Sequence, residues 1–253
     1  MRYGTLETTR SALFAEYQRY GEPDRPMRMD YFFWIVRNEE RLILVDTGFQ
    51  PEVGARKGRE VFCRPHEALH RLGLSGAAVS DLVLTHFHYD HIGNVATFPG
   101  ARIITSTREF AFWTGSDAEF TEDTPVEPDE VAVVVAARLD GRVTLLPEEP
   151  AGIPGLDIAE VAGHTPGQLV VTAATAEGVV VLASDAAHFY EEYRRDMPFH
   201  VYSDLPAMRQ GFRTLRSLTD RPGTVVVPGH DPEVMHNFPP VSLNTAGLAV
   251  RLG

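Results

Sequence analysis

The chain has only one cysteine, Cys63, and no apolar run near the roughly 20 residues that a membrane helix needs. One cysteine cannot form an internal disulfide, which favours a reducing compartment. The first residues, MRYGTLETTRSALFAEYQ, contain no continuous apolar stretch of signal-peptide length. We therefore expect a cytoplasmic protein with no membrane span.

Basic residues are also scarce. The sequence has 23 Lys and Arg against 35 Asp and Glu, a formal net charge of −12. A negative field repels phosphate backbones, so nucleic acid is not an expected partner. Hydrophobic residues make up 43% of the 253 positions, enough for a sizeable core without disulfides. The length suits one large domain or two small ones, and no internal repeat or low-complexity linker divides the chain.

Apolar periodicity predicts an alternation of strands and helices. The runs at 31–36 and 41–46, separated by RNEE, predict a β-hairpin. Further strands are predicted at 81–86, 101–105, 142–146, 156–162, 168–175, 178–185 and 223–230. Helices are predicted at 64–74, 107–115 and 205–219, and the acidic stretch 115–130 as a surface excursion. Because each half has strands first and a helix late, we expect two facing sheets with helices outside.

The stretch THFHYDHIGN follows an apolar strand and gathers His86, His88, Asp90 and His91. Imidazole and carboxylate ligands suit zinc and neighbouring first-row metals. In an extended segment His86 and His88 point the same way, and a turn after them can direct Asp90 and His91 to a different point. The motif can therefore hold two metal ions side by side.

Two metals need more ligands, and three later strands end in suitable residues. These are His164 in VAGHTPGQ, Asp185 in VVVLASD and His230 in VVVPGH. Loops at strand ends are where α/β folds build their sites. The alternatives are that the two histidines are ordinary loop residues and that Asp185 is a helix N-cap. We interpret Cys63 as inert and four other histidines as surface or structural: His66, His70, His200 and His236.

The motifs THFHYDHIGN, GHTPGQ, LASDAA and VPGHD, with LVDTGF around Asp46, resemble the metallo-β-lactamase superfamily in order and spacing. The resemblance spans about residues 30 to 235. It implies a four-layer αββα sandwich, here a single domain over 1–253 with an N-terminal extension over about 1–28. It assigns one metal to His86, His88 and His164, and a second to Asp90, His91 and His230. Asp185 and a hydroxide would bridge two divalent ions, with zinc expected first and manganese, iron or cobalt as alternatives. Asp46 is expected to support the site.

Within the superfamily, HYDHIGN, HTPGQ and SDAAHFYEE resemble the N-acyl homoserine lactonase group. That resemblance implies quorum quenching, by attack of the bridging hydroxide on a lactone, with Asp90 passing a proton to the leaving oxygen. Where lactonases of that group place a tyrosine, three residues after the bridging aspartate, this chain has His188, with Tyr190 two residues on. Either could donate a hydrogen bond to the substrate carbonyl, or both could only line the pocket.

Several alternatives stay open. The substrate could be another lactone, an ester, a thioester or a β-lactam, and an iron redox protein or a non-catalytic metal-binding module is also considered. Aromatic residues could line an acyl pocket or simply belong to the core: Phe110, Phe112, Trp113, Phe189, Tyr193, Phe199 and Tyr202. The resemblance to this family also implies a homodimer, which we expect to form through the N-terminal segment and the 50–75 region.

Overall fold

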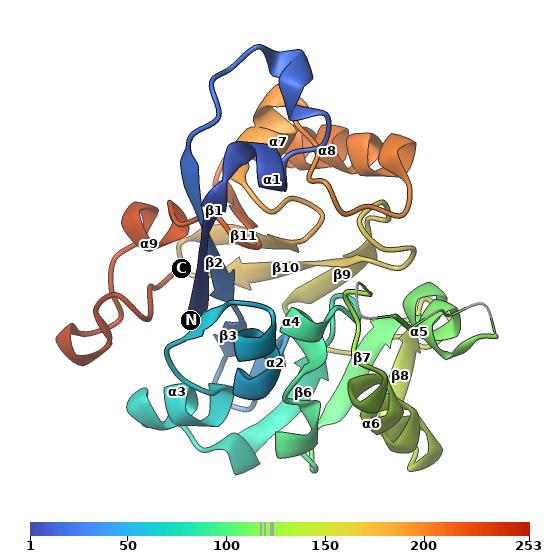
Figure 1. The fold of residues 1–253 in the computed structure, drawn as a ribbon. Coiled ribbons are helices and arrows are strands. Elements are labelled where there is room, and N and C mark those ends of the chain that lie inside the picture. The colour runs from blue at the N-terminus through green and yellow to red at the C-terminus, as the bar shows by residue number, and fades with distance from the viewer. Residues whose placement is uncertain (117, 119, 122–123) are drawn as a thin grey trace.

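The computed structural model describes residues 1–116, 118, 120, 121 and 124–253. Two mixed sheets face each other across its centre (Figure 1). The first has the order β3–β4–β6–β7–β8: β3 (Trp34–Arg37), β4 (Leu42–Val45), β6 (Val79–Val83), β7 (Arg102–Ser106) and β8 (Val143–Leu146). The second has the order β12–β11–β10–β9: β9 (Leu156–Glu160), β10 (Leu169–Thr175), β11 (Gly178–Ser184) and β12 (Thr224–Pro228).

Helices cover the outer faces of both sheets (Figure 1). On the side of the first sheet lie α2 (Pro51–Arg56), α3 (Pro65–Arg71), α4 (Tyr89–Ile92), α5 (Thr107–Thr114) and α6 (Pro128–Leu139). On the side of the second lie α7 (Tyr190–Arg195) and α8 (Leu205–Thr219). Two further short helices are α1 (Arg10–Leu13) and α9 (Val234–Asn237), and 3₁₀ turns lie at Tyr17–Tyr20, Gly76–Ala78, Val95–Thr97 and Leu243–Thr245. The predicted four-layer αββα sandwich is confirmed.

A third, smaller sheet has the order β2–β1–β5 and involves the N-terminal segment: β1 (Arg2–Thr9), β2 (Pro26–Phe32) and β5 (Glu60–Val61). The apolar run predicted as one strand at 31–36 is divided, because its first residues end β2 and Trp34 begins β3. The amino group of Met1 donates to the carbonyl of Phe33, 2.9 Å away, between these strands. The predicted extension thus contributes a strand to this sheet. That the whole chain forms a single domain stays a prediction.

The strands of the first sheet are apolar on both faces, and their side chains alternate between two cores. In β4, Leu42 and Leu44 belong to the core under α3 and α6, whereas Ile43 and Val45 belong to the core between the sheets. Successive side chains of a strand point to opposite faces, so a strand buried on both sides needs a continuous apolar run. This is why LILV and DLVL could be recognised from the sequence as buried strands.

Most of the other predicted elements are present with ends shifted by a few residues, but α6 was not predicted. The predicted excursion at 115–130 lies partly outside the described residues, and its last three residues begin α6. The segment VAVVVAARL is rich in β-branched residues, which favour strands. It nevertheless forms a helix because Val131, Val134 and Ala137, three residues apart, bury one face against the first sheet.

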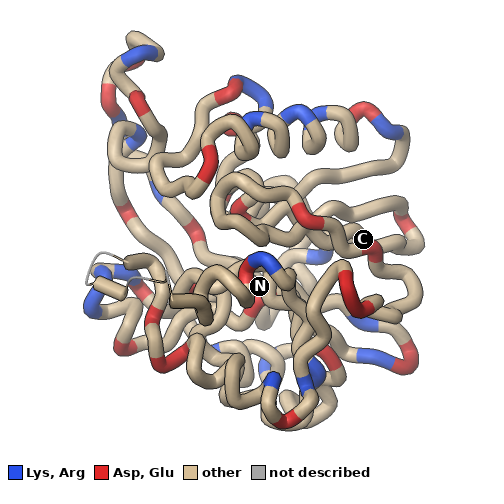
Figure 2. Tube along the Cα trace, turned by 90° about the vertical axis from the view of Figure 1, so that its right-hand side faces the viewer, with Lys and Arg blue, Asp and Glu red and all other residues tan. Residues whose placement is uncertain are grey.

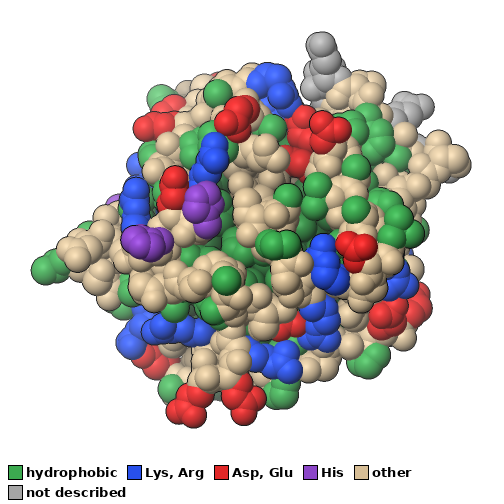
Figure 3. All heavy atoms as spheres, turned by 90° about the horizontal axis from the view of Figure 1, so that it is seen from below, with side chains coloured by type: hydrophobic (Ala, Val, Ile, Leu, Met, Phe, Trp, Pro, Cys, Tyr) green, Lys and Arg blue, Asp and Glu red, His purple; other side chains and the backbone are tan. Residues whose placement is uncertain are grey.

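Positions of Lys and Arg and of Asp and Glu are interspersed along the outer helices and turns (Figure 2). The face seen in Figure 3 interleaves charged side chains with scattered hydrophobic ones. In the described part of the chain, no helix combines the length and apolar character needed to cross a membrane. Cys63 is buried, and the four histidines predicted to be surface or structural are exposed: His66, His70, His200 and His236.

Glu130 in α6 gives a testable pH dependence. Its side chain is buried, and neither carboxylate oxygen has a hydrogen-bond partner among the described residues. Burial, with the neighbouring Glu127 and Asp90 carboxylates, raises the pKa of Glu130 from 4.5 to about 8. The folded state therefore binds this proton more tightly than the unfolded state, and stability falls as the pH rises through this interval.

We expect Glu130→Gln to raise the unfolding free energy by on the order of 2 kcal/mol at about pH 8.5, and to leave it nearly unchanged at about pH 4.5. Denaturant titration of variant and parent in the same metal state measures the difference. Asp129→Asn, at the exposed neighbouring position, is the control and should show no such trend. An equal stabilisation at both pH values would contradict the buried ionisation.

Candidate metal centre

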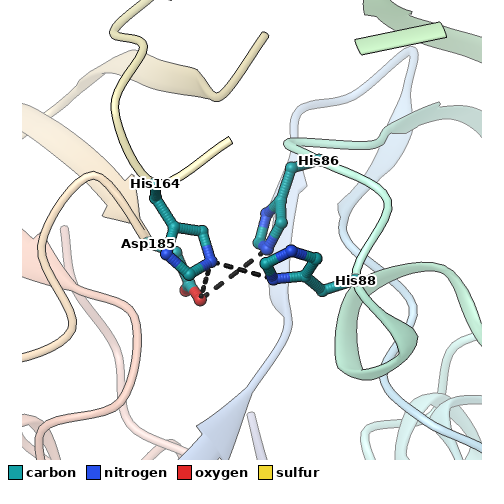
Figure 4. Close-up of side chains that lie close together, drawn as sticks. All are labelled: His86, His88, His164 and Asp185. Carbon is teal, nitrogen blue, oxygen red and sulfur yellow. Dashed lines mark hydrogen bonds and ion pairs between the residues drawn. The ribbon is translucent and has the colours of Figure 1, made fainter. Parts of the chain in front are cut away.

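The loops that leave one edge of the sandwich bring together all of the predicted metal ligands. His86, His88, His164 and Asp185 form one buried cluster, and Asp90, His91 and His230 form another. Within each cluster the potential ligand atoms lie within 4.8 Å of one another. Figure 4 shows the first cluster, with the three imidazoles and the Asp185 carboxylate turned toward a common point.

Asp185 stands between the two clusters and offers one oxygen to each. Its Oδ2 lies 3.3 Å from His164 Nε2 and 3.7 Å from His86 Nε2. Its Oδ1 lies 3.0 Å from His230 Nε2 and 3.5 Å from His91 Nε2. Ser184, directly before it at the end of β11, has a left-handed backbone with φ of 46°. Such a conformation is uncommon for a residue with a side chain and marks a turn that the surrounding structure must hold in place.

The donor atoms at the centre fit divalent metal ions. Among the described residues, the buried atoms without a hydrogen-bond partner include His86 Nε2, His91 Nε2, His230 Nε2 and Asp185 Oδ1. Buried polar atoms normally have partners, so a group of unpartnered ones facing each other needs a ligand. Imidazole nitrogens mixed with carboxylate oxygens match zinc and its neighbours. The two buried clusters are therefore consistent with a dinuclear metal site.

In three of the histidines, the ring nitrogen that faces away from the centre is hydrogen-bonded to another residue. His91 Nδ1 donates to Asp46 Oδ2 at 2.8 Å, His164 Nδ1 to the carbonyl of Val201 at 3.0 Å, and His230 Nδ1 to that of Asp30 at 2.9 Å. In the neutral imidazole these bonds leave Nε2 unprotonated and facing the centre, which is the tautomer a metal needs. His88 is the exception, because its Nδ1 faces the centre, 2.9 Å from His164 Nε2.

Asp46, in the turn after β4, has the supporting position predicted for it. Besides His91, its carboxylate accepts hydrogen bonds from the backbone and the hydroxyl of Thr85, at 2.8 and 2.9 Å. It thus ties the start of the histidine motif to its end. Its own backbone is left-handed, with φ of 65°.

The protonation preferences of the buried groups suit metal binding. Burial lowers the pKa of His86 and His164 well below the usual value, and that of His88 to about 4. Burial opposes charge on His91 too, but the carboxylates of Asp185, Asp90 and Asp46 raise its pKa well above the usual value. Metals bind the neutral imidazole, so the first cluster is ready at neutral pH and the second must release a proton.

Glu109 of α5 belongs to the frame of the site and could not be predicted. Its Oε1 accepts from the backbone of Phe87 at 3.0 Å and from the indole of Trp113 at 2.8 Å, and its Oε2 accepts from the backbone of Gly167 at 3.0 Å. The carboxylate therefore joins the histidine motif to the GHTPGQ loop. The sequence contains no local signal for this role, because the partners are distant along the chain.

The two predicted substrate-binding residues lie in different places. His188 is fully buried, and its Nε2 lies 3.1 Å from Asp185 Oδ2. Tyr190 packs against Tyr193 and under the guanidinium of Arg194, and its hydroxyl is within reach of Asn237. Among the described residues, these contacts of the Tyr190 side chain involve neither cluster. Only His188 is thus brought to the centre.

A facing pair of sheets with these two His and Asp clusters at one edge defines a class of metal-dependent hydrolases. The chain belongs to the metallo-beta-lactamase superfamily, whose family model matches residues 30–230. The prediction of that family is confirmed, and the site is of the HxHxD type found in its metal-dependent hydrolases.

The chain is similar to several N-acyl homoserine lactonases. AttM of Azorhizobium caulinodans is 28% identical over 174 residues, covering 66% of this chain and 64% of that protein, which is less than two thirds of its length. A lactonase of a Bacillus species is 23% identical over 226 residues, covering 83% of this chain and 85% of that protein.

Solved structures show the same fold. The crystal structure of a quorum-quenching N-acyl homoserine lactone lactonase has a TM-score of 0.74 at 20% identity, covering 92% of this chain and 91% of that one. The dizinc quorum-quenching lactonase AidC, in complex with a product, has a TM-score of 0.72 at 22% identity, covering 91% and 86%. At these identities the structural likeness establishes the fold.

Proposed function

We propose that the protein is a dinuclear metal-dependent lactonase, with an N-acyl homoserine lactone as its first expected substrate. The observation that carries the proposal is the position of Asp185, whose two oxygens face two separate ligand clusters. The lactone is proposed because the curated relatives named above are N-acyl homoserine lactonases.

The proposed ligand set uses the clusters as they stand. One metal would be held by His86, His88 and His164, the other by Asp90, His91 and His230, and Asp185 would bind both. When bound, two divalent ions, zinc first among them, would supply an activated water and Lewis acidity toward a carbonyl. The protein's contribution is to hold seven ligands rigidly and nearly out of reach of bulk water.

Asp90 is the proposed carrier of the proton that the leaving ring oxygen needs. Its Oδ2 lies 3.5 Å from His91 Nε2 and 3.7 Å from His230 Nε2, which places this oxygen toward the second cluster. The backbone carbonyl of the same residue accepts from the hydroxyl of Tyr3 at 2.7 Å. The residue is thus fixed by its main chain, and its second carboxylate oxygen is the proposed proton acceptor and donor.

Aromatic side chains beside the clusters suit an acyl chain. The centroid of the Trp113 ring lies 6.3 Å from that of His88. The rings of Phe112 and Phe120 pack beside Trp113, with centroids 4.9 and 6.1 Å from its own. Phe112 and Phe120 are partly exposed, at 41% and 39%. Exposed aromatics next to a buried polar centre are typical of a site that binds a partly apolar ligand. The predicted homodimer and cytoplasmic location stay predictions.

A substrate panel tests the proposal. Metal-replete protein is expected to open short- and long-chain acyl homoserine lactones, with acid release followed by a pH indicator. Plain γ-lactones, an ester, a thioester and a β-lactam complete the panel and represent the alternative hydrolase activities. Turnover of the ester or β-lactam alone, with two metals bound, would rule out the lactonase and leave another hydrolase of the same fold.

A further inference from the structure

His188 is held from three sides in the loop between β11 and α7. Its Nε2 lies 3.1 Å from Asp185 Oδ2, and its Nδ1 lies 3.3 Å from Glu192 Oε2. Its ring stacks on Phe199, with centroids 3.7 Å apart and an interplanar angle of 17°. The imidazole thus links the carboxylate that spans both clusters to a second carboxylate behind it.

Glu192 is the less expected member of this chain of contacts. Its side chain has no exposed surface, and its only ion pair in the described part of the chain is with His188. Its Oε1 also accepts from the backbone N–H groups of His188 and Phe189, at 3.0 and 3.1 Å. A neutral acceptor would be enough to cap this short helix. Burying a carboxylate costs free energy unless a charged or strongly polar group pairs with it.

The Asp185 carboxylate has a geometric need for such support. The terminal torsion of an aspartate is broad, so a strand end alone does not fix the plane of its two oxygens. That plane decides whether Oδ1 and Oδ2 can face separate metals. The close contact between His188 Nε2 and Oδ2, at 3.1 Å, restrains this rotation.

We propose that Glu192 is a positioning residue, which acts through His188 to aim the Asp185 carboxylate at both metal clusters. His188 is then part of the frame of the metal centre and not a donor to the substrate carbonyl. The inference rests on the metal centre of the proposed function and is independent of the identity of the substrate.

Glu192→Gln separates positioning from capping. The amide oxygen of glutamine can still accept from the two backbone N–H groups, but its NH₂ group cannot accept a proton from His188 Nδ1. Glu191→Gln is the matched control, one position away on the same helix, where the carboxylate instead pairs with Arg10 at 2.6 Å. Both variants are prepared metal-free, and thermal melting of the metal-free proteins checks that they fold.

Metal binding provides the measurement. Chelator competition gives the zinc affinities, and the visible absorption of the cobalt-substituted protein reports coordination geometry without any turnover. Glu192→Gln is expected to weaken at least one metal by about tenfold and to change the cobalt spectrum, as outer partners of ligands do. Glu191→Gln should match the parent. In a His188→Gln background, Glu192→Gln should add no further loss, because its effect passes through that ring.

The outcomes separate the two proposals. A parent protein that binds fewer than two metals would remove the proposed function itself. A parent that binds two, with Glu192→Gln unchanged in affinity and spectrum, would overturn the positioning role alone, as would a full effect of Glu192→Gln in the His188→Gln background. If Glu192→Gln does not fold, His188→Gln decides by itself: loss of metal supports the role and parental binding overturns it.

Discussion

Replacing Asp185 by asparagine is expected to reduce bound metal from two ions to one or none, and to lower hydrolysis on the order of a thousand-fold. Both oxygens of this carboxylate face imidazoles, and an amide offers only one oxygen without its charge. The activated water and the stabilisation of developing charge are together worth several kcal/mol, and each factor of ten in rate corresponds to about 1.4 kcal/mol. Metal analysis by mass spectrometry and initial rates on the best substrate measure the two effects.

Asp81→Asn is the matched control for this experiment. Asp81 is another buried aspartate, in β6, and it pairs with Arg41 at 3.2 Å and Arg102 at 2.7 Å. Its loss should lower the melting temperature, because it leaves two guanidinium groups without their shared partner. Two metals and near-parental turnover should remain. Full metal content in Asp185→Asn, or an equal loss of metal in Asp81→Asn, would contradict the bridging position.

The residues of the two clusters could be predicted because each carries a local signal. Each of them lies at the end of a predicted strand or in the segment that follows it, and such segments of a sandwich meet at one edge. The spacing of the three histidines in THFHYDHIGN also allows a turn in this segment to direct their side chains toward two different points. No contact with a distant residue had to be known to recognise them.

The outer frame of the site could not be predicted, since its contacts join residues far apart in the sequence. Glu109 and Glu192 look like ordinary helix glutamates, yet both are fully buried against the loops that present the ligands. The N-terminal strands are similar: Tyr3 donates to the Asp90 carbonyl, and Asp30 accepts from His230. Strands β1 and β2, the first of them within the predicted extension, thus take part in holding both ends of the second cluster.

Gly229→Ala is expected to damage the metal centre although Gly229 is outside both ligand clusters. A Cβ at this position would lie 2.6 Å from Asp185 Oδ1 and 2.8 Å from the backbone of Ser184. The backbone contact cannot give way, because Gly229 N donates to the Ala187 carbonyl at 3.0 Å and holds the two loops together. The carboxylate would have to turn away from the second cluster.

Overpacking of this kind costs about 1–3 kcal/mol, and a displacement near 1 Å at a reacting centre lowers rates by about a hundred-fold. We therefore expect Gly229→Ala to lose the metal of the second cluster first, with a moderate fall in melting temperature. Gly100→Ala is the control, since its Cβ would meet no atom within 4 Å. If Gly229→Ala retained both metals and parental activity, the close fit between the PGH loop and Asp185 would have no role in the metal centre. A parallel loss in Gly100→Ala would instead point to a general effect of removing glycine.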